Sequence, residues 1–453
     1  MKIQFLGATK TVTGSKYLLT IKNKKILVDC GLFQGLKELR LRNWAKLPIA
    51  ANEIDAVILT HAHIDHTGYL PLLVREGFKG NIYCTQSTKE LCEVLLPDSG
   101  YLQEEETRRA NKYGYTKHKP ALPLYTMADA KKSLDNFVAL EFDKNHIIFD
   151  DINFYFHGAG HILGASTISV SFKGRSILFS GDLGRYNDSV MYDPEPVKQA
   201  DYIVMESTYG DRLHEKTDAK VQLGEIINKT VERGGTLIIP AFAVGRTQNI
   251  LYYIYQLKQA GAIADIPVFL DSPMATSATD IFLAHPEGHR LSKEECEALS
   301  KVAKCITTVD ESKLIDTYKM PKIIISASGM ATGGRVLHHL RVFAGDHRNT
   351  ILFAGYQAAG TRGDTMVRGV SEVKLLGEVI QVRAEVIALS NVSAHADYQE
   401  TLKWLSSLRQ APKKIFITHG EVHAAEALKI KIEEQFGWNC VVPAYLQEED
   451  INS

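Results

Sequence analysis

The sequence of 453 residues lacks the features that mark membrane and secreted proteins. No apolar run approaches the roughly 18 residues that a membrane helix needs, and the N-terminal MKIQFLGATK shows no apolar stretch followed by a small-residue cleavage site. The six cysteines are scattered without a Cys-x-x-Cys pair, which is too sparse for a disulfide scaffold in a chain of this length. We therefore expect a cytoplasmic protein with reduced thiols and no membrane partner.

An excess of charge is also missing, because 52 Lys and Arg residues balance 53 Asp and Glu residues. No bulk basic field attracts nucleic acid, so any such binding must be local and the footprint short. The chain has no repeat of 20–50 residues and no low-complexity linker. The most charged and irregular segment, residues 97–125, predicts a helix followed by a basic loop, and we expect a solvated face or lid there rather than a substrate patch.

Short apolar runs that end in polar or glycine turns recur along the chain, and helical spacing fills many of the gaps between them. The helical spacing is clearest from Gln248 to Gln259. The pattern predicts an α/β protein, in which ligands gather at the carboxyl ends of strands. The predicted strands lie in residues 24–31, 53–63, 152–161, 176–182, 201–208, 236–242, 266–273, 322–329, 351–357 and 414–421.

The strongest chemical signal is Thr-His-Ala-His-Ile-Asp-His at residues 60–66, directly after a predicted strand. Alternate residues of an extended segment point the same way, so His61 and His63 can share one metal ion. Asp65 and His66, at the turn into a predicted helix, can face a second ion. Imidazole and carboxylate ligands suit zinc, manganese or iron, and three or more imidazoles favour zinc.

Two glycine-rich turns supply further ligands. His161 lies in GAGHILG (residues 158–164), and Asp182 lies in SGDLG (residues 180–184) after another apolar strand. Each motif alone is equally compatible with an ordinary turn. Beside the histidine cluster we expect both to bind metal, with the two carboxylate oxygens of Asp182 bridging two cations.

These residues resemble the metal motifs of the metallo-β-lactamase fold in order and spacing, with Asp29 after KKILV as a further match. The fold alone leaves several hydrolase functions open. Three more residues resemble the additional motifs of the β-CASP branch, whose members act on nucleic acids: Glu206 in MESTYG, His395 in SAHAD and His419 in THGE. Supporting matches are PAFAVGRTQ (240–248), DSPMAT (271–276) and SASGMATGGR (326–335).

The resemblance implies a ligand set for two zinc ions per chain, with manganese as an alternative. One ion is expected to bind His61, His63, His161 and Asp182, and the other to bind Asp65, His66, bridging Asp182 and His419. Asp29 would orient a metal-bound imidazole. In this family a histidine at the THGE position generally goes with RNA-directed members, whereas DNA-directed relatives carry valine, so His419 indicates RNA as the substrate. We expect that RNA to be single-stranded.

A binuclear centre of this kind supplies hydroxide at neutral pH for in-line attack on phosphorus, which gives Asp65 and Asp182 a catalytic role as well. We expect His395 to act as the general acid or as a phosphate clamp, and Glu206 to fix its protonation and orientation. Glu206 is alternatively a cap for the turn at Ser207 and Thr208.

Further residues are expected to bind substrate phosphates. Arg246 follows PAFAVG, and the turn of SASGMATGGR can point backbone N–H groups at an anion. The expected phosphate-binding residues are Arg246, Ser328, Gly329 and Arg335. No nucleotide cofactor is expected, because six residues separate Gly7 from Gly14 where a phosphate-binding P-loop needs four.

The resemblance also implies a metallo-β-lactamase αββα sandwich interrupted by an α/β β-CASP domain. Residues 1–207 would begin the sandwich, 208–383 would form the β-CASP domain, and 384–453 would complete the sandwich, with the active site between the domains. We expect no counterpart to the N-terminal RNA-binding domains of archaeal members or to the C-terminal extension of ribonuclease J, an expectation that disfavours processive 5′ exonuclease action and membership in a processing complex.

The function that follows is a zinc-dependent endonuclease of the group that includes the cleavage-and-polyadenylation endonuclease subunit and prokaryotic RNA-processing nucleases. A 5′–3′ exoribonuclease, a small-molecule metallo-hydrolase and a catalytically silent RNA-binding member remain the alternatives. The silent member is disfavoured because all seven expected ligands are present. The sequence leaves open the oligomeric state, including a homodimer, as well as the RNA target.

Overall fold

The computed structural model describes residues 1–114, 116–149 and 151–451, which fold into two compact units. The first unit joins Met1–Leu213 to His395–Ser453, and the second is His214–Ala394. The chain therefore changes unit at 213/214 and 394/395, whereas the predicted domain borders are 207/208 and 383/384. Residues 452–453 of the predicted C-terminal return lie outside the described residues.

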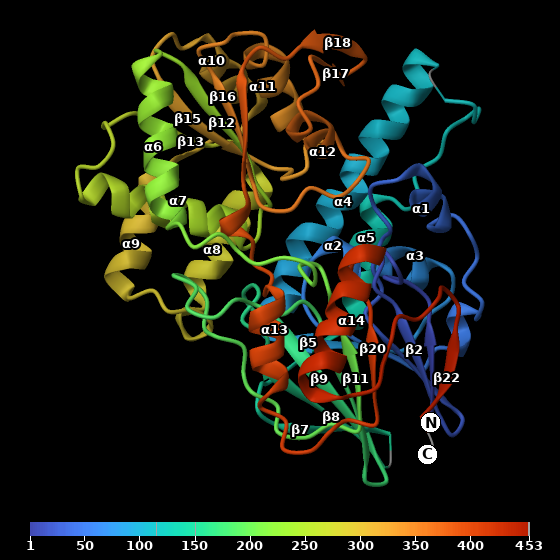
Figure 1. The fold of residues 1–453 in the computed structure, drawn as a ribbon. Helices are drawn as coiled ribbons and strands as arrows, with labels where there is room; N and C mark the ends of the chain where they lie inside the picture. Colours follow the sequence, from blue (N-terminus) through green and yellow to red (C-terminus); the bar gives the residue numbers. More distant parts are fainter. Residues whose placement is uncertain (115, 150, 452–453) are drawn as a thin grey trace. The chain divides into compact units, whose positions relative to one another are not determined.

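The first unit contains two seven-stranded sheets (Figure 1). One has the order β22-β1-β2-β3-β4-β5-β6, with bounds Glu448–Asp450, Lys2–Phe5, Tyr17–Ile21, Lys24–Val28, Ala56–Ile58, Asn81–Thr85 and Phe137–Leu140. The other has the order β21-β20-β11-β10-β9-β8-β7, with bounds Cys440–Val441, Lys414–Ile417, Tyr202–Met205, Arg175–Phe179, Ser166–Phe172, Ile152–Gly158 and Asn145–Phe149. β20 lies beside β11, so the C-terminal return completes this sheet.

The two sheets pack face to face through one hydrophobic core. Phe5 from the first sheet meets Phe416 from the second with ring centroids 5.1 Å apart, and Tyr17 meets Phe179 at 5.7 Å. On the outer face of the second sheet, the core continues into α13 (Tyr398–Leu405) and α14 (Val422–Phe436), where Trp404 is buried. The remaining helices of this unit are α1 (Lys37–Arg42), α2 (Ile64–Thr67), α3 (Leu70–Arg75), α4 (Gln86–Tyr113) and α5 (Met127–Ser133). The αββα sandwich is thereby confirmed.

α4 differs from the helix that the sequence predicts in residues 97–125. It begins at Gln86, where the Thr85 hydroxyl accepts the Thr88 N–H, and it ends at Gly114 in the left-handed conformation. Pro97 therefore lies inside the helix rather than before it. The predicted segment therefore contains the C-terminal part of a longer helix.

The second unit is built on a six-stranded sheet in which all pairings are parallel. Its order is β14-β13-β15-β12-β16-β19, with bounds Lys304–Cys305, Val268–Leu270, Lys322–Ser326, Thr236–Pro240, Thr350–Ala354 and Glu385–Leu389. The central strands are continuous apolar runs because helices cover both faces of such a sheet. The other elements are α6 (Ala219–Glu232), α7 (Arg246–Gln259), α8 (Pro273–Ala284), α9 (Lys293–Val302), α10 (Val309–Thr317), α11 (Val336–Phe343), α12 (Arg362–Val367) and the hairpin β17–β18 (Glu372–Leu375, Glu378–Gln381).

A buried charge network joins the strand ends and helices of this second unit. The Asp271 carboxylate, after β13, lies 2.6 Å from both Arg335 Nη1 and His339 Nε2, and it accepts the Ser312 hydroxyl at 2.5 Å. The other imidazole nitrogen of His339 lies 2.7 Å from Asp316. Burial alone would lower the pKa of His339, but the two carboxylates raise it to about 9.

The raised pKa of His339 predicts a pH dependence of stability. The folded pKa exceeds the usual 6.5, so the charged imidazole stabilises fully below about pH 6.5 and this contribution is lost as pH rises through about 9. At 1.36 kcal/mol per pKa unit, the loss is about 3 kcal/mol. Chemical denaturation between these pH values measures it, with His339→Gln as the reference. An equal pH slope in both proteins would contradict the prediction.

No helix in the described ranges is both long enough and apolar enough to span a bilayer. The α/β class predicted from the sequence is confirmed, with mixed sheets in the first unit and a parallel sheet in the second.

Candidate active site

The predicted metal ligands converge at one edge of the first unit. β4 is fully buried and pairs in parallel with β3 and β5. The histidine motif follows its carboxyl end, with α2 beginning at Ile64. His161 follows β8, Asp182 follows β10 and His419 follows β20. The two sheets thus bring residues that are far apart in sequence to a common site.

The first donor set consists of His61, His63, His161 and Asp182. His63 Nδ1 lies 3.1 Å from His61 Nε2 and 3.4 Å from His161 Nε2. Asp182 Oδ2 lies 3.4 Å from His61 Nε2 and 3.5 Å from His161 Nε2. Four donor atoms from four residues therefore face one small volume.

The second donor set consists of Asp65, His66 and His419. His419 Nε2 lies 3.2 Å from His66 Nε2 and 3.5 Å from Asp65 Oδ2. The remaining oxygen of Asp182, Oδ1, lies 3.2 Å from His66 Nε2. Asp182 thus turns one carboxylate oxygen toward each set, which is the geometry of a bridging ligand.

These spacings fit zinc. Metal–nitrogen bonds of about 2.0–2.1 Å in a tetrahedron place the donor atoms about 3.3–3.4 Å apart. The four donor-atom separations given above for the first set run from 3.1 to 3.5 Å, and imidazole-rich donor sets favour zinc. The first set supplies four ligands, and the second supplies three plus Asp182 Oδ1.

Burial keeps the histidines of the first donor set in the neutral form that binds metal. Desolvation lowers the pKa of His61 to about 3 and that of His63 to about 4, and it holds the pKa of His161 well below its usual value. Burial would raise the pKa of Asp182, but His419, His66 and His61 hold it well below its usual range. At neutral pH the set therefore presents neutral imidazoles and an ionised carboxylate, the forms that bind cations.

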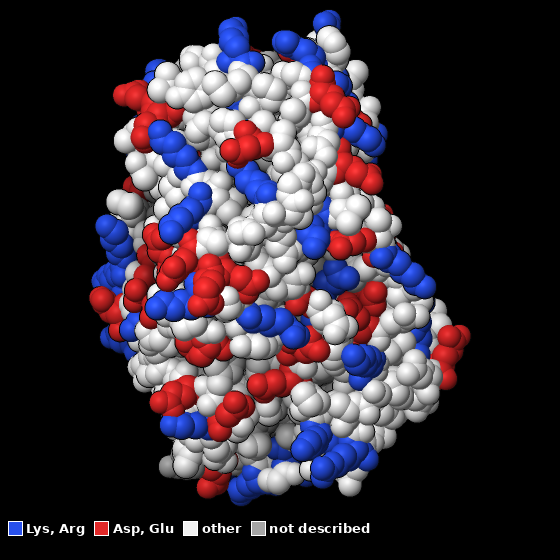
Figure 2. Space-filling model, turned by 90° about the vertical axis from the view of Figure 1, so that its left-hand side faces the viewer, with Lys and Arg blue, Asp and Glu red and all other residues white. Residues whose placement is uncertain are grey.

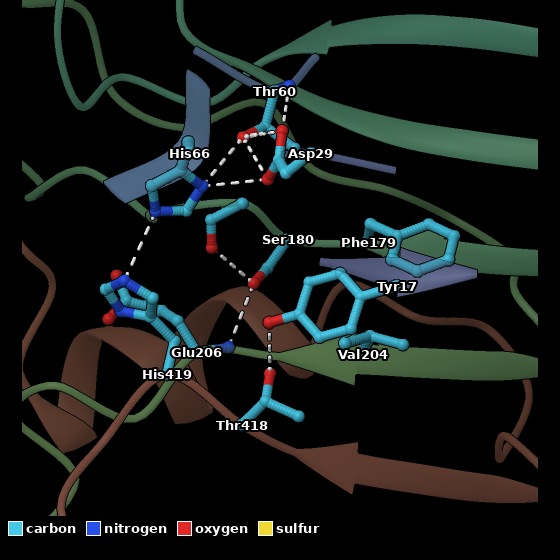
Figure 3. Close-up of a pocket in the computed structure, with 11 residues that line it drawn as sticks. Tyr17, Asp29, Thr60, His66, Phe179, Ser180, Val204, Glu206, Thr418 and His419 are labelled. Carbon is cyan, nitrogen blue, oxygen red and sulfur yellow. Dashed lines mark hydrogen bonds and ion pairs between the residues drawn. The ribbon is translucent and has the colours of Figure 1, made fainter. Parts of the chain in front are cut away.

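Asp29 and Thr60 orient His66 from behind (Figure 3). Asp29 Oδ2 lies 2.8 Å from His66 Nδ1, which turns His66 Nε2 toward Asp182 and His419. Asp29 also accepts the Thr60 N–H at 2.8 Å and the Thr60 hydroxyl at 2.9 Å. Asp29 and His419 both adopt left-handed backbone conformations, with φ of 57° and 47°, a strain that tends to cluster at functional sites.

Neither Thr60 nor Thr208 is among the predicted site residues. The Thr60 hydroxyl lies 3.0 Å from His61 Nδ1, and the Thr208 hydroxyl lies 3.2 Å from His419 Nδ1. The Thr60 hydroxyl therefore holds the His61 ring from the side away from its donor set. The Thr208 hydroxyl contacts the same nitrogen of His419 that lies 3.5 Å from Asp182 Oδ1. Thr60 directly precedes His61 and Thr208 lies two positions after Glu206, which is the only signal in the sequence, and threonine at such positions is otherwise common in turns.

Replacing Asp29 with asparagine tests the role of this support. Loss of the charge that holds His66 Nδ1 should weaken metal binding at the second set by about 10- to 100-fold and leave the first set unchanged. Stepwise metal titration of chelator-treated protein measures both affinities. Asp55→Asn, which alters a half-buried carboxylate on the same sheet, is the matched control. Equal weakening in both variants would contradict a specific role for Asp29.

His395 and Glu206 form a pair beside the donor sets. Glu206 Oε1 lies 3.1 Å from His395 Nδ1 and accepts the Leu183 N–H at 2.7 Å. Glu206 Oε2 accepts the Thr208 N–H at 3.1 Å, so the carboxylate both caps the turn and contacts the histidine. Burial lowers the pKa of His395, but Glu206 and then Asp182 raise it above its usual value. The side chain of His395 is 17% exposed, which leaves it open to substrate.

The four predicted phosphate-binding residues belong to the second unit, whereas the donor sets and the pair of His395 and Glu206 belong to the first. Arg246 is buried at the start of α7. The Ser328 hydroxyl accepts the Thr332 N–H at 3.0 Å, and Gly329 follows it in the same turn. The Arg335 guanidinium is held by Asp271 and by the carbonyls of Ile306 and Thr307. Their contact with phosphate stays a prediction.

Three family models match the chain. Residues 11–228 match the metallo-beta-lactamase superfamily, residues 247–366 the Beta-Casp domain, and residues 379–443 the Zn-dependent metallo-hydrolase RNA specificity domain.

Two relatives and one solved structure match nearly the whole length of this chain. The chain is 34% identical to Ribonuclease TTHA0252 of Thermus thermophilus, over 94% of this chain and 95% of that protein. It is 32% identical to Transcription termination factor FttA of Methanosarcina mazei, over 96% of this chain and 70% of that protein. A crystal structure of a protein of unknown function from Enterococcus faecalis shares the fold, with a TM-score of 0.54, 13% identity and 99% of each chain covered.

The family expected from the histidine motif, Asp182, Glu206, His395 and His419 is therefore the right one. The chain belongs to the β-CASP family of zinc-dependent metallo-hydrolases within the metallo-β-lactamase superfamily.

Proposed function

We propose that this chain is a ribonuclease that hydrolyses phosphodiester bonds within single-stranded RNA with two zinc ions. The observation that carries the proposal is Asp182, whose two carboxylate oxygens face two separate donor sets. Similarity to a protein named as a ribonuclease, and the match to an RNA specificity domain, support RNA as the substrate. The seven predicted ligands, His61, His63, Asp65, His66, His161, Asp182 and His419, all belong to these sets.

Two zinc ions held there would lower the pKa of a water between them and neutralise charge on a phosphoryl oxygen. The chain's own residues supply the rest. Asp65 stays ionised because His419 and His66 hold its pKa far below the usual range against the effect of burial. Glu206 raises the pKa of His395 and so favours its protonated form, which can give its Nε2 proton to the departing oxygen or hold the phosphate.

We further propose that the first unit performs the chemistry and the second contributes phosphate contacts through Arg246, Ser328, Gly329 and Arg335. All six cysteines are free thiols, and we place the reaction in the cytoplasm, where thiols stay reduced.

An RNA labelled separately at each end tests the proposal with metal-quantified protein, alongside DNA of the same sequence. Internal cuts in RNA that are lost in Asp182→Ala support the endonuclease. Release of nucleotides from the 5′ end favours the exoribonuclease alternative. Protein that holds zinc but cuts neither substrate contradicts the proposal and favours a small-molecule hydrolase or a silent RNA-binding protein.

Substitution of His395 by alanine separates proton transfer from metal binding. Because His395 belongs to neither donor set described above, zinc content should stay unchanged while the rate of RNA cleavage falls by about 10²- to 10⁴-fold. Single-turnover cleavage together with metal analysis measures the two effects. Near-normal cleavage, or a parallel loss of zinc, would contradict the role of His395.

A further inference from the structure

A strongly basic segment lies at the end of α4, outside the site described above. Residues 107–128 contain five Lys and Arg residues and no Asp or Glu, in a chain whose overall charges balance. Elsewhere the charges are mixed, and Figure 2 shows acidic and basic side chains interspersed over the face it presents. Because this segment contains no carboxylate, none of its positive charges is neutralised from within it.

In the described ranges this segment is anchored to α4 by several hydrogen bonds. α4 spans 28 residues, or about 42 Å, and its C-terminal end stands apart from the strands of its unit (Figure 1). After α4 the chain turns back, and residues 121–125 are hydrogen-bonded to side chains of the helix. Asn111 bonds Ala121 twice, at 2.7 and 3.0 Å, and Gln103 accepts the Leu124 N–H at 3.2 Å. The Ser99 and Tyr125 hydroxyls lie 2.7 Å apart.

The cations of this segment are exposed and largely unneutralised. Arg108 pairs with Glu105. In the described ranges the other four, Arg109, Lys112, Lys117 and Lys119, are exposed and have no ion-pair partner, and we call them the basic arm. Tyr113, 68% exposed, lies among them with Lys112 Nζ 5.2 Å from its ring centroid.

We propose that the basic arm binds the phosphates of the RNA strand. The inference rests on the proposed function and adds to it a binding site within the first unit. Exposed cations with an exposed aromatic ring are the combination that holds single strands, since cations follow the phosphates while the ring stacks on a base. An acidic protein partner would also be attracted to the exposed cations, but it has no base that could stack on the ring of Tyr113. The segment expected to be a solvated face or lid is therefore assigned a substrate contact.

The salt dependence of RNA binding tests the arm directly. The probe is a phosphorothioate-linked RNA of about 20 nucleotides, longer than the roughly 4–16 nucleotides of one single-strand site, which keeps its charge and resists hydrolysis. Each phosphate contact contributes about 0.7 to the slope of log affinity against log salt. The triple variant Lys112→Gln, Lys117→Gln, Lys119→Gln should therefore lower the slope by about 2 and weaken binding at low salt by about tenfold or more.

Two matched variants make the result specific. Lys46→Gln, Lys79→Gln, Lys198→Gln removes the same charge from exposed lysines elsewhere in the first unit and should leave the slope unchanged. Replacing the three arm lysines with arginine should also preserve the slope, because arginine keeps the charge.

The inference would be overturned if the salt slope stayed unchanged in the glutamine variant of the basic arm, or if it fell equally in the control that begins with Lys46→Gln. An acidic protein would then remain as the partner of the basic arm. Because the probe is not hydrolysed, binding is read without cleavage. A protein whose arm binds RNA but which cuts none would contradict the proposed function and leave this inference standing.

Discussion

Replacing Asp182 with alanine should empty both metal sites at once and lower RNA hydrolysis by about 10³-fold or more. Asp182 Oδ2 faces His61 and His161, while Oδ1 faces His66, so one truncation removes a ligand from each set. Metal catalysis contributes several kcal/mol of transition-state stabilisation, and each 1.36 kcal/mol is tenfold in rate. Metal analysis and single-turnover cleavage measure the two effects.

His63→Ala is the matched control for that experiment. His63 belongs to the first donor set alone, so this variant should retain about one metal per chain while Asp182→Ala retains none. Asp182→Asn refines the comparison, because it keeps the size of the side chain but replaces one oxygen with an NH2 group that cannot bind a cation. Two tightly bound metals in Asp182→Ala would show that the carboxylate does not join the sets.

The second large effect is expected on stability. Asp271→Ala removes the carboxylate that neutralises buried His339 and holds Arg335 in the second unit. Removing one partner of a buried charge pair costs about 3–5 kcal/mol, because it leaves the other charge uncompensated. For a unit of this size the midpoint of thermal unfolding should fall by about 6–20 °C. Differential scanning calorimetry on the metal-loaded protein measures the shift.

Glu378→Gln is the control for the buried network. It removes the carboxylate of a surface pair with Arg341, at 3.4 Å and with both side chains well exposed, and should cost less than about 1 kcal/mol. Zinc content should stay normal in both variants, because Asp271 lies in the other unit from the donor sets. Equal destabilisation by the two substitutions would contradict the assigned importance of Asp271.

The sequence predicted most of the candidate site because its ligands sit in short motifs. The histidine motif spans six residues, and strand ends in an α/β fold meet at one edge, so local pattern and topology together indicate where chemistry lies. The assignment of each ligand to one of two sets came from resemblance to a family. The structure adds the distances and the orientation of each Asp182 oxygen.

Features that depend on tertiary contacts could not be predicted in this way. The roles of Thr60 and Thr208 arise only when three strand ends meet. The network of Asp271, Ser312, Arg335 and His339 joins residues up to 68 positions apart, so no local motif indicates that Arg335 pairs with Asp271. α4 continues through Pro97 because packing overrides local propensity.

The central claim is that Asp182 joins two donor sets into one binuclear centre. Crystals of zinc-loaded protein, measured on both sides of the zinc absorption edge, test it most directly. The account predicts two anomalous peaks about 3.5–4 Å apart, one among His61, His63 and His161 and the other among Asp65, His66 and His419, with one Asp182 oxygen on each. A single peak, or two peaks that Asp182 does not bridge, would contradict it.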